Sequence, residues 1–484
     1  MRFSLKLGLI FLFLVFIVQF GQAYETEMFT EVDFFQDEYI RDYFEPNIYD
    51  ISKNPALYRI SYRNNFSIYN IQGERQLNNY ARYFDPRQKN NAGLDLRWIK
   101  QLTKNSTLAS GVKYQRSDHF NVTRSLEKNY YAHYFSFTDT TTGNIEYQGP
   151  RLWILYNHEL ADKLLLGLEI DYGVERGLKD VYTECETILR SVDAKMGIGY
   201  HSPDEKTILG INTRYFNRQG KYEAVKEMED ALVKTWFGYN LYYPENPRRV
   251  NRKNDDREGY KIGVQLERKN ILNTGCGARL SGSYGQTKNS IEVGRPSLPQ
   301  QRGYWEREGF QFTGNIYYHK EKIKGLLYVK YKNYFDWAKP KEFKVVALEN
   351  DEEISKIGGL FQIHPLPKLQ LDLGFELSSF SRDYSEYAAA FNYNQDRNHN
   401  FLLTGGQYEL NSISGLHLHA KYGSYEPDFH WPDTEQFDVI GGEAGYKRTF
   451  LFGTLDLSLN YYKHKPDNID ESIERFGVTI YYLK

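Results

Sequence analysis

Few residues in this chain have the types and spacing that chemistry would need. His417 and His419 lie two positions apart, a spacing that allows both imidazoles to bind one metal ion. An acid stands next to a histidine in Asp118-His119 and in Asp428-Phe-His430, as a general acid–base pair would require. The sequence around them supplies no nucleophile, no second acid pair and no further metal ligand at a fixed spacing. We therefore expect no enzyme activity, no metal site and no bound cofactor.

The segments that carry these residues follow a two-residue period. Between Gly453 and Tyr461, the apolar Leu455, Leu457 and Leu459 alternate with polar residues. Because successive side chains of a strand point to opposite faces, such a strand has one apolar and one polar face. The same alternation recurs at 94–98, 164–172, 209–214, 260–267, 369–377 and 416–422. Repeated along the chain in stretches of about ten residues, it predicts an all-β transmembrane barrel of the outer-membrane type.

Short polar turns alternate with longer polar loops. We expect turns at 103–106, 161–162, 203–206, 269–272, 320–321, 365–367, 411–412 and 448–449. The longer loops are expected at 72–91, 118–148, 175–188, 219–256, 289–307, 336–353, 381–398, 425–436 and 465–473. This alternation predicts a closed antiparallel barrel of about 18 strands, or 16–20, with short periplasmic turns and long extracellular loops. Two strand-like segments, 128–138 and 232–243, fall inside loops, either as extracellular hairpin arms or as a further pair in the wall.

The N-terminal segment and the composition predict a secreted protein that lies in a membrane. Residues 1–23 have the basic start, apolar run and small-residue site of a cleavable secretion signal. Aromatic residues make up 16% of the chain, and tyrosine suits membrane–water boundaries. A net charge of -2 gives no reason to expect a nucleic-acid partner. Cys185 and Cys276 are too few for a disulfide framework and are expected at opposite rims.

Three parts follow from this organisation. After the signal, residues 24–56 form an acidic, aromatic segment that is either a plug inside the lumen or a periplasmic tail. Residues 57–484 form the barrel. Such a protein is expected in the outer membrane of a Gram-negative bacterium, surrounded by lipid.

Both ends of the barrel carry short motifs. The last strand resembles the C-terminal signal that barrel assembly machinery recognises, with Gly477, Ile480 and Tyr482 at defined positions. Asn54-Pro-Ala-Leu57 resembles the Asn-Pro-Ala element that precedes the first strand in fatty-acid-transporter-like (FadL-type) barrels, with Leu57 where glycine is usual. The wider chain resembles uncharacterised porin- or transporter-like outer-membrane barrels. The resemblance implies the assembly machinery as a partner during biogenesis.

The polar faces of the predicted strands give the lining of the lumen. Both signs of charge occur there, which favours a hydrated channel or a salt-bridged interior over an ion-selective pore. The expected lining residues are Arg59, Arg63, Asp95, Arg97, Lys113, Glu169, Asp171, Arg214, Lys261, Glu267, Arg279, Asp372, Glu376, His417, His419, Lys421 and Asp456.

Barrels of this size enclose an aqueous channel unless a loop or plug fills it. We therefore expect a channel or transporter for a small polar solute. The alternative is a binding or scaffold barrel whose long loops engage a surface lipoprotein, another protein or a glycan. Aromatic and arginine side chains in the loop 219–256 are typical of binding surfaces, and the same loop could equally fold over and narrow the pore. Its candidate residues are Trp236, Tyr239, Tyr242, Tyr243, Arg248 and Arg249.

Overall fold

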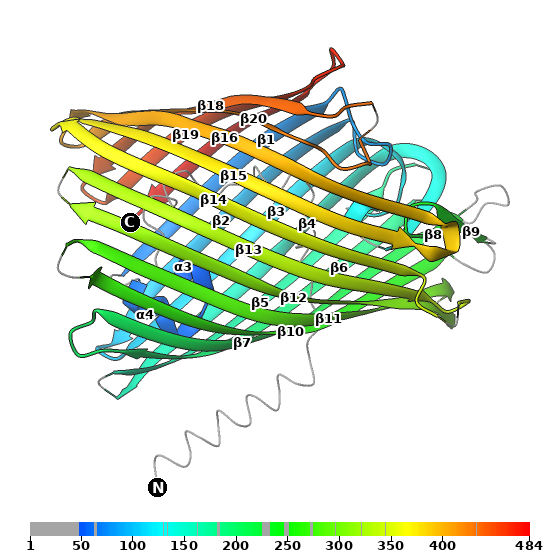
Figure 1. Cartoon of the computed structure of the whole chain (residues 1–484), viewed down its shortest axis with the longest axis horizontal. Coiled ribbons are helices and arrows are strands. Elements are labelled where there is room, and N and C mark those ends of the chain that lie inside the picture. The colour runs from blue at the N-terminus through cyan, green and yellow to red at the C-terminus, as the bar shows by residue number, and fades with distance from the viewer. Residues whose placement is uncertain are drawn as a thin grey trace, which may run out of the picture.

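The wall of the molecule is a single antiparallel sheet closed into a barrel. The computed structural model describes residues 48–484 apart from 62–64, 129, 133, 162, 182–183, 225–232, 246–250, 272–273, 296, 321, 344 and 432. Eighteen strands form the wall, as predicted (Figure 1). Closure comes from pairing of the first and last strands, with Ile68 opposite Leu483. In the described part of the chain, no helix is long and apolar enough to span a membrane.

The strands follow one another around the wall in chain order. They are β1 (Phe66–Asn78), β2 (Gln88–Thr103), β3 (Ser106–Ser125), β4 (Phe135–Ala161), β5 (Leu164–Lys179), β6 (Cys185–His201), β7 (Thr207–Ala224), β10 (Arg252–Ile271), β11 (Cys276–Arg295), β12 (Leu298–Lys320), β13 (Ile323–Pro340), β14 (Leu348–Leu366), β15 (Leu369–Glu386), β16 (Phe391–Asn411), β17 (Ser414–Tyr425), β18 (Phe437–Phe450), β19 (Gly453–Pro466) and β20 (Ile473–Leu483). The short elements outside the wall are α3 (Ile48–Ser52), η2 (Pro55–Leu57), α4 (Tyr58–Ser61), η3 (Tyr130–Ala132), β8 (Val233–Phe237), β9 (Leu241–Glu245) and η4 (Tyr387–Ala389).

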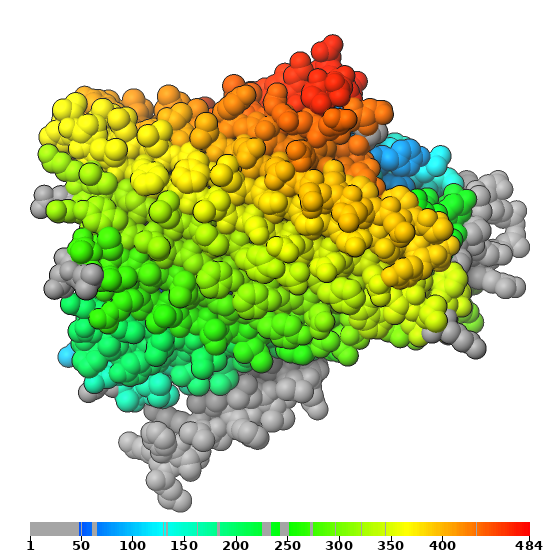
Figure 2. All heavy atoms as spheres, viewed as in Figure 1, coloured from blue at the N-terminus to red at the C-terminus, as the bar shows by residue number. Residues whose placement is uncertain are grey.

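The two faces of the wall differ as the alternation predicts. On β19, Leu457 and Leu459 are exposed on the outside, whereas Asp456 and Ser458 are buried on the inside. The same holds on β2, where Leu94 is exposed and Asp95 is buried. A continuous apolar outer surface of this kind marks a membrane-facing wall. Figure 2 shows one side of the molecule, where the colour changes in tilted bands from one part of the chain to the next.

This assignment of faces predicts opposite results for two neighbouring substitutions. Leu457→Arg places a charge on the lipid face and should destabilise the folded barrel by about 2–4 kcal/mol near the midplane. Asp456→Asn keeps a polar group inside and should leave stability nearly unchanged. Urea unfolding in phospholipid vesicles measures both. Equal costs for the two variants would contradict the assignment of inside and outside.

Many strands are longer than a membrane requires. β4 has 27 residues and β12 has 23, whereas a transmembrane strand needs about 9–11. The loops join these strands at the end opposite the short turns (Figure 1). Strands of this length exceed the span that a membrane requires. The two free cysteines lie at opposite rims, because Cys185 begins β6 at the loop end and Cys276 begins β11 at the turn end.

Two predicted turns are displaced along the chain. The turn expected at 269–272 lies between Ile271 and Cys276. The turn expected at 448–449 is wrong, because those residues still pair within β18 and β19, with Thr449 opposite Thr454. The actual turn falls at the apolar Leu451 and Phe452. Apolar residues carry no turn signal, so the polar pair just before them was the more turn-like choice.

The N-terminal boundary of the wall also differs from the expectation. β1 begins at Phe66 rather than directly after Leu57. Asn54 caps η2 by accepting a hydrogen bond from the Ala56 N–H, and Pro55 occupies the first position, where a missing N–H costs nothing. Residues 54–61 therefore form short helical turns inside the barrel. Of the segment 24–56, only residues 48–56 are described; the signal peptide lies outside the described residues.

Candidate functional site

Acid–base pairs line the inner face of the wall. Most predicted lining residues belong to such pairs, with partners on the same strand, on a neighbouring strand or, for Asp372 and His419, on strands separated by one other. The pairs are Asp95 with Arg97 (2.6 Å), Glu169 with Lys195 (2.8 Å), Asp171 with Arg151 (2.7 Å), Asp193 with Arg214 (2.6 Å), Glu267 with Arg279 (2.7 Å), Asp372 with His419 (3.0 Å) and Glu376 with Lys356 (3.7 Å). The partners Arg151, Asp193 and Lys356 were not among the predicted residues. They lie on the polar faces of their strands, which is the signal that could have found them.

The other predicted lining residues have mixed surroundings. Arg59 is on α4 rather than on a wall strand, and its guanidinium binds Glu159 at 2.6 Å. Arg63 lies outside the described residues. His417 lies 3.4 Å from Glu443 and 3.9 Å from Asp456, and Lys261 donates a hydrogen bond to Gln311. The ammonium group of Lys421 lies 4.7 Å from the centre of the Phe401 ring, and Lys113 pairs opposite Asp95.

Near the inner end, the residues Asn54–Leu57, here called the docking element, attach to the inner face of the wall. The Asn54 side chain is fully buried and donates to Gln265 Oε1 at 2.7 Å and to the Ile211 carbonyl at 3.3 Å. Asn157 of β4 donates its amide hydrogens to the carbonyls of Pro55 (2.9 Å) and Ala56 (2.5 Å). Two buried carboxamides thus satisfy the polar groups of the element, which fixes its position.

Glycines make room for the docking element. A Cβ on Gly197 would lie 1.8 Å from Asn54 Oδ1, and one on Gly167 would lie 2.1 Å from the Pro55 carbonyl carbon. A Cβ on Gly199 would lie 2.7 Å from Leu57. These glycines, here called the glycine socket, belong to β5 and β6. The socket was not predicted, although glycines at alternate inward positions of neighbouring strands are a readable signal of close approach.

At the outer end, loops from several sides of the barrel meet in a buried aromatic cluster, here called the outer cap. It includes η3, the start of β4 and the hairpin of β8 and β9. β8 pairs with β4, Phe135 opposite Phe237, so both strand-like segments predicted within loops are hairpin or strand extensions. The buried cluster is made of Tyr134, Phe135, Phe237, Ile291, Trp305, Ala338, Ala347, Leu348 and Tyr384.

One hydrogen-bond network crosses the mouth. Tyr134, just before β4, donates its hydroxyl to Asp336 of β13 at 2.5 Å. Six wall strands lie between β4 and β13 along the shorter way round, β5, β6, β7, β10, β11 and β12. Asp336 is fully buried and also accepts from Arg307 (2.5 Å) and Asn350 (3.0 Å). A buried carboxylate with three charged or polar partners of this kind is a fixed point of the cap.

A second buried contact of the cap is an ion pair. Lys253 of β10 binds Glu127, in the connection between β3 and η3, at 2.7 Å, and both side chains are fully buried. The backbone N–H of Phe137 donates to the same carboxylate at 2.5 Å. Burial raises the pKa of Glu127 to about 7, because the charged form loses its hydration.

This shift gives the cap a pH dependence with a definite sign. The closed cap holds a proton on Glu127 more tightly than an open loop would, because the ordinary pKa of a solvated glutamate is near 4.5. Protonation of Glu127 therefore stabilises the closed cap fully below about pH 4.5, and this stabilisation is lost as the pH rises through about 7. Outer loops should therefore resist protease better at pH 5 than at pH 8, measured relative to Glu127→Gln, which lacks the titration. If the ratio of cleavage rates between the natural protein and Glu127→Gln were the same at pH 5 and pH 8, the raised pKa of Glu127 would be contradicted.

The predicted loop residues are mostly used within the cap. The Trp236 indole donates to Thr138 at 3.0 Å, and Tyr239 packs 4.2 Å from the His430 ring. Tyr242 keeps an exposed face. Tyr243 lies on β9, and Arg248 and Arg249 lie outside the described residues. The described part of this loop is folded over the mouth.

The two acid–histidine pairs have different surroundings. His430 is 3.9 Å from Asp428 within the cap, and burial lowers its pKa to about 3. His119 bonds Ser117 at 3.0 Å, while Asp118 binds Arg116. Among the described residues, no three potential ligands gather closely enough to hold a metal ion.

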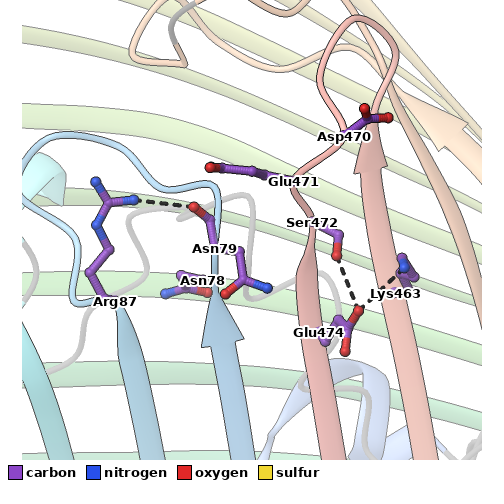
Figure 3. Close-up of a pocket in the computed structure, with 8 residues that line it drawn as sticks. All are labelled: Asn78, Asn79, Arg87, Lys463, Asp470, Glu471, Ser472 and Glu474. Atoms are coloured by element: carbon purple, nitrogen blue, oxygen red, sulfur yellow. Dashed lines mark hydrogen bonds and ion pairs between the residues drawn. The ribbon is translucent and has the colours of Figure 1, made fainter.

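A polar cleft of about 760 Å³ opens at the loop ends of β1, β19 and β20 (Figure 3). Lys463 binds Glu474 at 3.3 Å on one side, and Arg87 donates to the Asn79 carbonyl at 3.3 Å on the other. The cleft is lined by Asn78, Asn79, Arg87, Lys463, Asp470, Glu471, Ser472 and Glu474. It offers hydrogen-bond donors and acceptors, and charges of both signs, at the outer rim.

The three residues of the predicted assembly signal lie on β20, between β19 and β1. A Cβ on Gly477 would lie 2.4 Å from Asn460 Oδ1, and the Tyr482 hydroxyl donates to the Phe452 carbonyl at 2.9 Å. Ile480 faces outward. These positions close the seam of the barrel; recognition by assembly machinery stays a prediction.

Comparison with known proteins adds a family and a fold. Residues 55–474 match a family described as "Family of unknown function (DUF6850)". No curated protein matches the sequence. Among solved structures, BauA, the ferric preacinetobactin receptor from Acinetobacter baumannii, is similar with a TM-score of 0.50 and 8% identity, over 87% of this chain and 80% of that one.

The copper transporter OprC is similar to the same degree, with a TM-score of 0.50 and 9% identity, over 85% of this chain and 64% of that one. At such identity the likeness concerns the fold alone. The fold is a closed antiparallel barrel of the outer-membrane type.

Proposed function

The chain belongs to the DUF6850 family of unknown function, and from its closed barrel we propose a gated outer-membrane transporter for a small polar solute. The observation that carries this proposal is that parts of the chain occupy both ends of a polar interior. The docking element lies at the inner end, and the outer cap crosses the mouth. A gated path, rather than a permanently open pore, requires such contacts at its ends.

The lining supports a solute that is polar without being a simple ion. Charged side chains on the inner face are joined in pairs, so neither sign dominates. A pore selective for ions of one charge would carry an excess of the opposite sign. Paired ions still offer hydrogen-bond donors and acceptors, which hydroxyl, amide or zwitterionic groups can use without a large electrostatic barrier.

The two ends act in series in this proposal. The docking element contacts β4 to β7 at the inner end, and the cap joins β4, β10, β13 and β15 at the outer end. Release of one end leaves the other in place, so a solute passes only when both open or when they open in turn. This arrangement keeps the two compartments separate at rest.

Swelling of protein-containing vesicles tests the proposal. A barrel released at both ends should admit small neutral sugars at a rate that falls with solute size, and a KCl gradient across it should give a reversal potential near zero. If the released and folded barrel admits no solute, transport is wrong, and the scaffold alternative becomes the better account.

A further inference from the structure

The tip of the β8–β9 hairpin holds a carboxylate. Glu386, the last residue of β15, is buried and accepts hydrogen bonds from the backbone N–H groups of Tyr239 (2.5 Å) and Asn240 (3.2 Å). The Asn240 side-chain amide also donates at 3.2 Å, and the Tyr384 hydroxyl donates at 2.5 Å. All four donors are neutral groups. Successive backbone N–H groups that converge in this way form an anion-binding concavity.

The hairpin is shaped for this contact. Gly238 has a φ of +61, and a Cβ there would lie 2.3 Å from the Glu386 carboxylate oxygen. Only glycine allows both the backbone conformation and the close approach. Asn240 is exposed although the carboxylate it binds is buried, so the concavity lies directly beneath the solvent-facing side of the tip.

The contact joins two parts of the barrel that are distant around the wall. The hairpin rises between β7 and β10, while Glu386 ends β15, with five wall strands, β10 to β14, in between. Lifting the hairpin separates its three donors, the backbone N–H groups of Tyr239 and Asn240 and the Asn240 amide, from Glu386, whereas Tyr384 stays beside Glu386 on β15. A carboxylate from solution then meets these three donors, and a ligand that binds only the lifted hairpin shifts the equilibrium toward it.

We propose that the hairpin tip is a carboxylate-binding site that Glu386 fills when the barrel is closed, and that a solute bearing a carboxylate takes its place when the cap opens. This inference rests on the proposed function and narrows its solute to one with a carboxylate group. Because Glu386 is tethered, it competes at an effective concentration in the millimolar range, so a free monocarboxylate acts only above that range.

The test follows the position of the hairpin rather than transport. Thr138 is buried and pairs with Lys234 of β8, so a cysteine there reacts with a maleimide only when the hairpin lifts. The natural thiols are removed by Cys185→Ala and Cys276→Ser. In this Thr138→Cys protein, acetate at high millimolar concentration should speed labelling, whereas acetamide, its neutral counterpart, should not.

When Glu386→Ala is added to the Thr138→Cys protein, acetate is expected to have the opposite effect on labelling. Without its carboxylate the hairpin lifts readily, and labelling should be at least about tenfold faster. Acetate should now fill the vacant place and slow labelling, again unlike acetamide. Glu386→Gln, which keeps one acceptor oxygen, should fall between the two proteins. Heat-modifiable migration shows that each variant is folded.

The two opposite effects of acetate on labelling test whether the hairpin tip binds a carboxylate from solution. If acetate leaves labelling of Glu386→Ala unchanged, the contact is a structural latch and not an anion site. If acetate fails to speed labelling of the Glu386 protein, solute carboxylates do not release the cap. Either result overturns the inference without bearing on whether the opened barrel passes solutes, which vesicle swelling measures separately.

Discussion

Gly197→Ala is expected to expel the docking element from the wall. The added methyl carbon would lie 1.8 Å from Asn54 Oδ1, closer than any non-bonded contact allows. Asn54 cannot move alone, because its amide is bound to Gln265 and the neighbouring carbonyls are bound to Asn157. Losing these buried hydrogen bonds costs about 1–3 kcal/mol for each group left unsatisfied. The element should leave its site while the wall stays intact.

The release is measured by modification of a cysteine placed at Ala56, which is fully buried when docked. Labelling from the inner side should be slow in the parent protein and fast with Gly197→Ala. Gly73→Ala is the matched control, because a Cβ at Gly73 meets nothing within 4 Å. Equal labelling of both glycine variants would contradict the proposed packing of the socket.

Asp336→Ala should weaken the outer cap by the largest amount of any single change there. The substitution removes the acceptor that Tyr134, Arg307 and Asn350 share. Arg307 then keeps a charge inside the cap without this partner, and breaking a buried pair in this way costs about 3–5 kcal/mol. Since Tyr134 belongs to the far side of the mouth, the loss should free the hairpin and η3 together.

Cleavage of the outer loops by an added protease in intact vesicles measures this effect. Asp351→Ala is the control, since Asp351 lies on the neighbouring β14, is exposed and accepts a hydrogen bond from Asn333 at 3.3 Å. Asp336→Ala should be cleaved much faster than Asp351→Ala at equal barrel stability. A cap that stays resistant without Asp336 would show that the aromatic cluster alone holds it.

The barrel could be predicted from sequence because its signal is local. Alternation along each strand fixes which side chains face lipid, and Leu457 beside Asp456 shows it in two residues. The strand number follows from counting connections. The turn at Leu451 and Phe452 was missed because its residues are apolar, whereas the polar pair that resembles a turn lies three residues earlier.

The contacts that close the two ends could not be predicted because they join distant parts of the chain. Asn54 and Gln265 are 211 residues apart, and Tyr134 and Asp336 are 202 apart. Which loops meet over the mouth depends on the circular order of the strands and on how far each extends above the membrane. The partners of the lining charges were predictable in type, because opposite signs on one face tend to pair, but not residue by residue.

The most direct test of two closures in series is single-channel conductance of four proteins in a planar bilayer. The first is the full chain, and the second carries Gly197→Ala. The third replaces residues 225–250 by Asn-Gly, a two-residue turn that suits Ala224 and Asn251 because their backbones are already hydrogen-bonded at 2.8 Å. The fourth combines both changes. We expect the first three to be silent or nearly so and the fourth to conduct steadily. Steady conductance in the full chain, or full opening by either single change, would contradict the account.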